Sequence, residues 1–244
     1  LFINSKGVCI DTRKIDDVII GCANQAGEDN RNVARMSLLL AGIPFTVPGE
    51  TVNRLCASGM SAVIHAHRAI SSGDGDLFIS GGVENMTRGP WVISKASKAF
   101  GRDAQMHDSS FGWRFINPKM KELYGVDGMG NTAEAVANEF NISREDQDEF
   151  ALNSQKKTLA AITNNKFDDE LIKINQNGNI LEKDEHPRKG LELSDLEKLK
   201  TVFKDDGTVT PGNSSGINDG AAALILTNLQ EAEKKSIKPL ARIV

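Results

Sequence analysis

The feature that most constrains the fold is an alternation of apolar strands and helical patterns at the start of the chain. Short apolar runs that end at turns predict buried strands at residues 17–22, 51–55 and 76–80. Helical periodicity predicts helices between them, at residues 31–41 and 57–71. Strands that alternate with helices in this way are typical of β–α–β units, so we expect an α/β fold with a mostly parallel sheet.

The second predicted helix has a distinct face and a distinct end. Its apolar face carries Met60, Val63, Ile64 and His67. Gly73 follows the helix in the position expected of a helix stop. His65 and His67 are two residues apart and point to different sides of the helix, so we expect no shared metal site and a partly buried His67.

A long segment with few strand signals follows the third strand. Helices are predicted at residues 132–140 and 144–164. Ser143 is a good N-cap for the second of these helices, and Asp146 completes a loose capping box. Residues 173–189 are polar, so we expect them to be exposed.

The core pattern returns near the end of the chain. We expect a strand at residues 221–226, a helix at 229–235 and the start of a strand at 241–244. The sequence therefore predicts an α/β core that is interrupted by one mostly helical insertion. The predicted segments are a first core part, an insertion and the returning core strands, at residues 1–86, 87–207 and 208–244.

Composition excludes several classes of protein. The net charge is -4 and no block of Lys and Arg is present, so we expect no nucleic-acid partner. No apolar run is long enough to span a bilayer and no secretory signal pattern is present, so we expect no membrane association. The three cysteines, Cys9, Cys22 and Cys56, are odd in number and lack zinc-ligand spacing. This predicts no disulfide framework, no metal site and a reducing, cytoplasmic location.

Cys56 is the candidate nucleophile on local physical grounds. It lies between a predicted strand and a predicted helix, where backbone N–H groups and the helix dipole converge and stabilise a thiolate. The small residues that follow, Ala57, Ser58 and Gly59, leave room for a substrate. The alternative is a buried core cysteine, which is the more common situation for a lone cysteine.

Several ordered motifs resemble those of the thiolases and cover nearly the whole chain. They are V-N-R-L-C-A-S-G-M-S-A-V at 52–63, I-S-G-G-V-E-N-M-T at 79–87, T-A-E-A-V-A at 132–137, D-E-H-P-R at 184–188 and N-S-S-G-I-N-D-G-A-A-A-L at 213–224. The resemblance implies a thiolase-type layered α/β/α core with a helical loop domain that binds coenzyme A. Glu84 follows the third predicted strand within one of these motifs, and we expect it to have a structural role as an acceptor for backbone N–H groups.

By this resemblance, Cys56 takes the acyl group from a 3-oxoacyl-CoA and passes it to coenzyme A, which is a substrate, so that no resident cofactor is needed. The family activates its nucleophile with a histidine in a G-H-P motif and uses a second cysteine in a C-x-G motif. Neither motif occurs in this sequence, and the N-E-A-F motif of the family's second half is also absent. We therefore expect a first domain with its loop domain, without the C-terminal catalytic half, and little turnover by this chain alone.

The resemblance also assigns positions that contact coenzyme A. Arg188 corresponds to the arginine near the adenine and phosphates, and Ser215 to the serine that meets the pantetheine. Met129, Phe203 and Ile217 correspond to apolar wall positions. Gly128 replaces the histidine that many relatives have before this methionine, which weakens one expected pantetheine contact. The alternative interpretation, without the resemblance, is that Arg188 is a solvated surface residue and that Ser215 is a turn residue.

Within the family, the chain is most similar to the 3-oxoadipyl-CoA thiolases of aromatic-compound breakdown. The stretches C-A-N-Q-A-G-E-D-N-R-N-V-A-R-M at 22–36 and F-G-W-R-F-I-N-P at 111–118 carry this similarity. Arg114 is then a candidate partner for the free carboxylate of the acyl chain, because an arginine fork suits a carboxylate. The alternative is a surface arginine that packs beside Trp113.

Two other functions remain open from the sequence. One is a non-catalytic thiolase remnant that binds acyl-CoA. The other is a condensing enzyme of the wider superfamily, although C-A-S-G-M and N-S-S-G-I-N-D-G favour a thiolase. The resemblance further implies a homodimer or homotetramer, with the strand at residues 76–80 in the region of the dimer contact.

Overall fold

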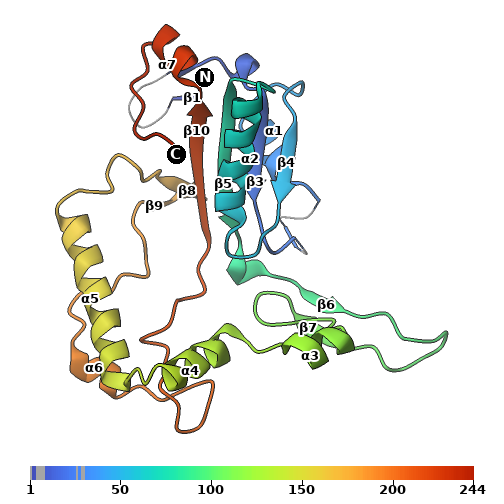
Figure 1. The fold of residues 1–244 in the computed structure, drawn as a ribbon, viewed down its shortest axis with the longest axis vertical. Coiled ribbons are helices and arrows are strands. Elements are labelled where there is room, and N and C mark those ends of the chain that lie inside the picture. The colour runs from blue at the N-terminus through green and yellow to red at the C-terminus, as the bar shows by residue number, and fades with distance from the viewer. Residues whose placement is uncertain (1, 4–8, 26, 29–30) are drawn as a thin grey trace. The chain divides into compact units, whose positions relative to one another are not determined.

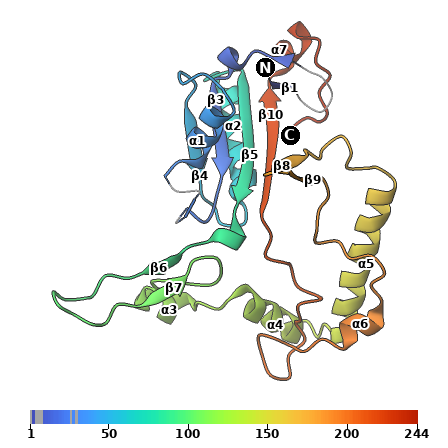
Figure 2. The same ribbon diagram turned by 180° about the vertical axis from the view of Figure 1, so that it is seen from behind.

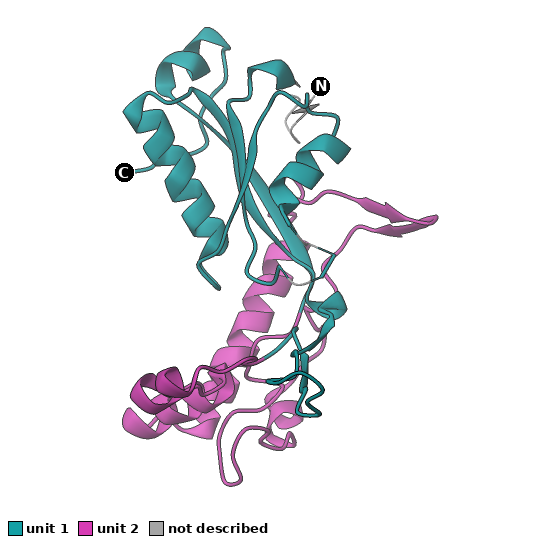
Figure 3. Cartoon of the chain, turned by 90° about the vertical axis from the view of Figure 1, so that its right-hand side faces the viewer, with its two compact units in different colours: residues 1–111, 218–244 teal, residues 112–217 magenta. Residues whose placement is uncertain are grey.

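The computed structural model describes residues 2–3, 9–25, 27–28 and 31–244. It divides into two compact units, the first formed by residues 1–111 and 218–244 and the second by residues 112–217 (Figure 3). These boundaries differ from the predicted ones at 86/87 and 207/208. Residues 87–111 group with the first unit, where the Asn24 amide donates to the Ser109 carbonyl. Residues 208–217 group with the second unit through bonds to its helices, for example from Thr208 to Glu134.

A four-stranded sheet forms the centre of the first unit (Figure 1). Its strands, in spatial order, are β10 (Gly220–Thr227), β5 (Leu77–Glu84), β3 (Asp17–Gly21) and β4 (Gly49–Val52). β3 runs parallel to β4 and β5, whereas β10 is antiparallel to β5. The prediction of a mostly parallel sheet is therefore confirmed, with one antiparallel strand at the edge.

Helices lie on both faces of this sheet, as Figure 3 shows. Alternate residues of a strand point to opposite faces. Val18 and Ile20 of β3 pack in a cluster with Leu38 of α1 (Val33–Leu40). Ile19 packs instead with Ala62 of α2 (Ser58–Ser72). The predicted layered α/β/α arrangement is confirmed.

The buried face of α2 differs from the predicted one. Its buried residues are small: Ser58, Ser61, Ala62 and Ala66. Met60 is 68% exposed, and His67 is half-buried, as is His65. The helix lies so close to the sheet that a Cβ atom added to Gly21 would fall within 3.0 Å of backbone atoms of Ser58. Such an approach leaves no room for the larger side chains that periodicity alone had selected.

The end of α2 follows the prediction. Gly73 has a left-handed φ of 82°, which glycine adopts without steric cost, and its N–H donates to the last carbonyl groups of the helix. The strand predicted at residues 51–55 ends earlier, at Val52, because residues 53–57 form a turn. β5 continues four residues beyond its predicted end and pairs with β10 along its whole length.

The remaining elements of the first unit are short. They are β1 (Phe2–Ile3), β2 (Cys9–Ile10), a 3₁₀ turn at Thr12–Lys14, another at Met86–Arg88, the hairpin of β6 (Trp91–Ile93) with β7 (Met106–Asp108), and α7 (Leu229–Lys234). The strand predicted at residues 241–244 is wrong, since these residues form no strand in the structure. An apolar run becomes a strand only where its backbone groups find a neighbour to pair with.

The second unit is mostly helical, as predicted. Its elements are α3 (Pro118–Tyr124), α4 (Met129–Glu139), α5 (Arg144–Thr163), the hairpin of β8 (Ile174–Gln176) with β9 (Asn179–Leu181), and α6 (Leu193–Glu197), and Figure 2 shows the helices from behind. The Ser143–Asp146 capping box at the start of α5 is confirmed. The β8–β9 hairpin is exposed, in agreement with the prediction for residues 173–189. None of the described helices is long and apolar enough to cross a membrane.

Candidate active site

Cys56 lies on the turn that joins β4 to α2, two residues before the helix begins. Its side chain is an exposed free thiol, so the alternative of a buried core cysteine is excluded. Leu55 immediately before it has a φ of 50°, in the left-handed region that non-glycine residues rarely occupy. A sharp backbone turn of this kind presents the residue that follows it to solvent, a geometry also found at strand–turn–helix nucleophile sites.

Hydrogen bonds from two side chains hold this turn. Ser58, which is buried at the start of α2, accepts from the Arg54 N–H at 2.8 Å and donates to the Leu55 carbonyl at 2.6 Å. Asn53 accepts from the Leu55 N–H at 2.9 Å. The N-cap position is Ala57, which cannot cap the helix with its side chain. The positive end of the helix dipole therefore lies next to Cys56 without a competing side-chain acceptor at the cap.

Glu84, the last residue of β5, is bonded to the segment that follows β3. Its carboxylate accepts from the N–H groups of Ala23 and Asn24, the latter at 3.3 Å. The prediction that Glu84 accepts backbone N–H groups is thus confirmed. Asn53 also donates to the Ala23 carbonyl at 3.1 Å. Together these bonds join the Cys56 turn to the carboxyl ends of β3 and β5, the edge where ligands bind in open α/β sheets.

A second carboxylate lies where β10 begins. Asp219 accepts from the N–H of Thr87 at 2.9 Å and from its hydroxyl group at 2.6 Å. These bonds hold the pKa of Asp219 below its usual range. They join two of the sequence motifs, 79–87 and 213–224, at one end of the β5–β10 pair.

The described residues contain no group of three His, Cys, Asp or Glu side chains that could hold a metal ion. Cys22 is fully buried at the end of β3, with its thiol 3.4 Å from the Asn24 carbonyl. Cys56 is therefore the accessible thiol of the two whose side chains are described. The side chain of Cys9 lies outside the described part of the chain.

In the second unit, two of the predicted coenzyme A positions lie close together. Met129 is the first residue of α4 and is 71% exposed. A Cβ atom on Gly130 would fall within 3.0 Å of the Phe203 ring, so Phe203 packs directly on the same helix. Phe203 also lines a cavity of about 280 Å³ with Asn131 and other α4 residues.

The other predicted positions of this unit are in separate segments. Ser215 and Ile217 are both exposed near the end of the unit. Arg188 is exposed beyond β9, and its backbone N–H donates to Gln155 of α5 at 2.9 Å. Arg114 is half-buried near the start of the unit. The structure thus places Phe203 against the first turn of α4, which also carries Met129, whereas Ser215, Ile217 and Arg188 are exposed on other segments.

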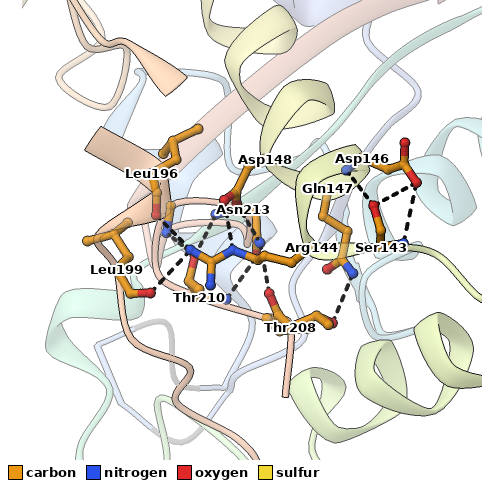
Figure 4. Close-up of polar contacts among 12 residues, drawn as sticks. Ser143, Arg144, Asp146, Gln147, Asp148, Leu196, Leu199, Thr208, Thr210 and Asn213 are labelled. Atoms are coloured by element: carbon orange, nitrogen blue, oxygen red, sulfur yellow. Dashed lines mark hydrogen bonds and ion pairs between the residues drawn. The ribbon is translucent and has the colours of Figure 1, made fainter. Parts of the chain in front are cut away.

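Two buried carboxylates that sequence reasoning did not select hold the segment that leads to Ser215. Glu134 of α4 accepts from the N–H groups of Thr208 and Val209 at 2.9 Å and 2.8 Å. Asp148 of α5 accepts from Asn213 at 2.9 Å, as Figure 4 shows. Glu134 lies in the T-A-E-A-V-A motif, so that motif was the available signal, whereas no motif marked Asp148.

The pH dependence of stability should report on Glu134. Burial raises its pKa, but hydrogen bonds from Val209 and Thr208 outweigh burial and leave the pKa below its usual value of 4.5. A lowered folded-state pKa means that the carboxylate stabilises the fold above the unfolded pKa, and that this stability is lost as pH falls through the folded value. We expect Glu134→Gln to lower the free energy of unfolding at neutral pH by about 1–3 kcal/mol, because the glutamine amide places an N–H donor against backbone N–H groups.

Urea unfolding at neutral pH and at a series of lower pH values that passes below the folded-state pKa of Glu134 measures this effect. The wild-type and Glu134→Gln midpoints should converge at the lower pH. Glu122→Gln, on the exposed surface of α3, is the matched control and should leave both midpoints unchanged. A constant difference between wild type and Glu134→Gln across this range would contradict the assignment.

Comparison of the sequence with known proteins identifies similar proteins along nearly the whole chain. The family model for the thiolase N-terminal domain matches residues 2–230. The chain is 51% identical over 239 residues to a beta-ketoadipyl-CoA thiolase of Pseudomonas aeruginosa, and 52% identical over 240 residues to the 3-oxoadipyl-CoA/3-oxo-5,6-dehydrosuberyl-CoA thiolase of Escherichia coli. Each alignment covers 96% of this chain and 60% of the relative. The chain therefore spans about 60% of the length of these relatives.

Solved structures agree with this result. The structure of human mitochondrial 3-ketoacyl-CoA thiolase in complex with CoA matches with a TM-score of 0.85 and 33% identity, over 95% of this chain and 57% of that chain. The acetyl-CoA acetyltransferase of Bacillus anthracis matches with a TM-score of 0.80 and 36% identity, over 95% and 58%. The fold, the position of Cys56 and the match to the family model lead to one conclusion: this chain belongs to the thiolase family, and it carries the family's N-terminal domain.

Proposed function

We propose that this chain provides the nucleophile and the acyl-CoA-binding part of a thiolase, in which Cys56 carries the acyl group between a 3-oxoacyl-CoA and coenzyme A. The observation that supports this role is the exposed Cys56 thiol on a fixed turn between a strand and a helix. Coenzyme A is a substrate in this proposal, and no resident cofactor is required.

The proposed reaction has two steps. The Cys56 thiolate attacks the 3-oxo carbon, the bond between C2 and C3 breaks, and its electron pair leaves on the acetyl-CoA enolate, which then takes a proton. In the second step the thiolate of coenzyme A attacks the acyl-cysteine carbonyl and releases Cys56. Covalent catalysis replaces one difficult cleavage by two easier steps. The N-terminus of α2, which has no side-chain cap, lies next to Cys56.

We propose that the second unit contributes the contacts to coenzyme A, through Arg188, Ser215, Met129, Phe203 and Ile217. Four of these side chains are exposed, and Phe203 is half-buried beside a cavity. Similarity to a human thiolase whose structure contains CoA supports this assignment. We further propose a homodimer or homotetramer in the cytoplasm. The free thiol of Cys56 suits a reducing compartment, and β10 is an edge strand that, within the described part of the chain, pairs with β5 alone.

Intact-mass spectrometry after incubation with 3-oxoadipyl-CoA or acetoacetyl-CoA tests the proposal. We expect a succinyl adduct from the first substrate and an acetyl adduct from the second, both mapped to Cys56 by peptide digestion. An adduct on another residue would contradict the proposal. Binding of coenzyme A with no adduct on a readily alkylated Cys56 would favour a non-catalytic acyl-CoA-binding protein.

We propose 3-oxoadipyl-CoA as the preferred substrate, with Arg114 as the partner of its free carboxylate. The identity of 51% to a beta-ketoadipyl-CoA thiolase, against 37% to a probable acetyl-CoA acyltransferase of Staphylococcus aureus, supports this substrate. We expect Arg114→Ala to raise the 3-oxoadipyl-CoA concentration for half-maximal acylation of Cys56 by about tenfold or more, because a charge-assisted hydrogen bond is lost. The value for acetoacetyl-CoA should not change.

Arg102→Ala is the matched control for this measurement, because Arg102 is an exposed arginine of the first unit. It should affect neither substrate. Equal effects of Arg114→Ala on both substrates would reject Arg114 as the carboxylate partner.

A further inference from the structure

Two residues of α5, Arg144 and the buried Asp148, form an ion pair in the second unit. The Asp148 side chain is 1% exposed and accepts from Arg144 Nε at 2.7 Å. Arg144 Nη2 donates in addition to the carbonyl groups of Leu196 at 2.6 Å and Leu199 at 3.1 Å. Arg144 thus links α5 to α6, and its positive charge is the counterion of the Asp148 carboxylate.

The second oxygen of Asp148 binds a turn that lies far away in sequence. Asp148 Oδ1 accepts from the Asn213 amide at 2.9 Å. The same amide group donates to the Thr208 carbonyl at 3.0 Å, and its oxygen accepts from the Thr210 N–H at 2.8 Å. Both amide protons and the amide oxygen of Asn213 are therefore in use, so its side chain fixes the turn at 208–213 in one register against α5 (Figure 4).

Hydrogen bonds within the turn also stabilise it. The fully buried Thr210 hydroxyl accepts from the N–H groups of Gly212 at 3.2 Å and Asn213 at 3.3 Å. Ser214 donates to the Thr210 carbonyl at 2.7 Å. The hydrogen-bonded frame ends at Ser214, and the next residue, Ser215, is exposed.

From this arrangement we propose that Asp148, acting through Asn213, is the positioning residue for the segment from Ser215 to Ile217 where that segment meets the pantetheine arm of coenzyme A. The inference rests on the proposed function, in which this segment contacts coenzyme A. A buried ion pair contributes little net stability compared with well-packed apolar residues, so the geometry that it imposes is its more important effect. In this role Asp148 does not touch the ligand and takes no part in the chemistry.

Calorimetric titration of this chain with two ligands tests the inference. Coenzyme A contains the pantetheine arm, whereas 3′-phospho-ADP, its nucleotide part, does not. We expect Asn213→Ala to raise the Kd for coenzyme A by about tenfold, as expected from the loss of one well-placed contact, and to leave the Kd for 3′-phospho-ADP unchanged. Asp148→Asn, which keeps the side-chain volume, should act in the same direction and provides a second variant if the first does not fold.

Ser143→Ala is the matched control, because it removes the capping box of the same helix without touching the turn at 208–213. It should lower the urea midpoint and leave both Kd values unchanged. Equal weakening of both ligands by the Asn213 and Asp148 variants, or no weakening at all, would overturn the inference while the proposed function stands. Failure of the wild-type chain to bind either ligand would overturn the proposed coenzyme A site and the inference with it.

Discussion

Replacing Cys56 with alanine is expected to abolish covalent acylation of the chain by 3-oxoacyl-CoA substrates. The exposed thiol of Cys56 lies on the turn before α2, and an alanine at this position offers no atom that could carry the acyl group. Loss of a catalytic nucleophile typically lowers turnover by a factor on the order of 10⁴ or more. The adduct measured by intact-mass spectrometry should therefore fall below detection, while the urea midpoint changes little because the side chain is exposed.

Cys22→Ala is the matched control for this experiment. Cys22 is fully buried at the end of β3, so it should be inaccessible to substrate in the folded chain. The variant should keep acylation of Cys56 and lose some stability, since a buried side chain is made smaller. If acylation persists in Cys56→Ala and disappears in Cys22→Ala, the nucleophile has been assigned to the wrong cysteine.

The parts of the fold that the sequence predicted are those that local physics determines. The helix that became α2 ends at Gly73 because glycine adopts the left-handed conformation there, and α5 begins at Ser143 because of its capping box. Alternation of strands and helices was enough to predict the parallel pairing of β3 with β4 and β5. The position of Cys56 between a strand and a helix follows from the same local reasoning.

The parts that the sequence did not predict depend on partners far apart in the chain. Periodicity alone does not reveal that β10 pairs antiparallel with β5, more than a hundred residues earlier. The bond from Asn213 to Asp148 is another case, because it joins residues that are 65 positions apart. The buried face of α2 was predicted wrongly for a similar reason, since its identity depends on how closely β3 approaches the helix.

That close approach leads to the second prediction, for Gly21→Ala. Gly21 is the last residue of β3, and a Cβ atom there would fall within 3.0 Å of backbone atoms of Ser58 and Gly59. Backbone atoms cannot move aside as a flexible side chain can, so the start of α2 must shift away from the sheet. Overpacking of this kind typically lowers the free energy of unfolding by about 1–3 kcal/mol, and for Gly21→Ala we expect a loss at or above the upper end of that range.

Displacement of α2 should alter the Cys56 turn as well as the stability of the fold. Ser58 holds the turn that presents Cys56, through its bonds to Arg54 and Leu55, so displacement of α2 also moves the thiol. We therefore expect Gly21→Ala to lower both the urea midpoint and the rate of Cys56 acylation. Gly220→Ala is the matched control, because a Cβ atom on Gly220 of β10 would meet nothing within 4 Å. Full stability and normal acylation in Gly21→Ala would show that β3 and α2 can separate without cost, and the glycine would then have no steric role at this contact.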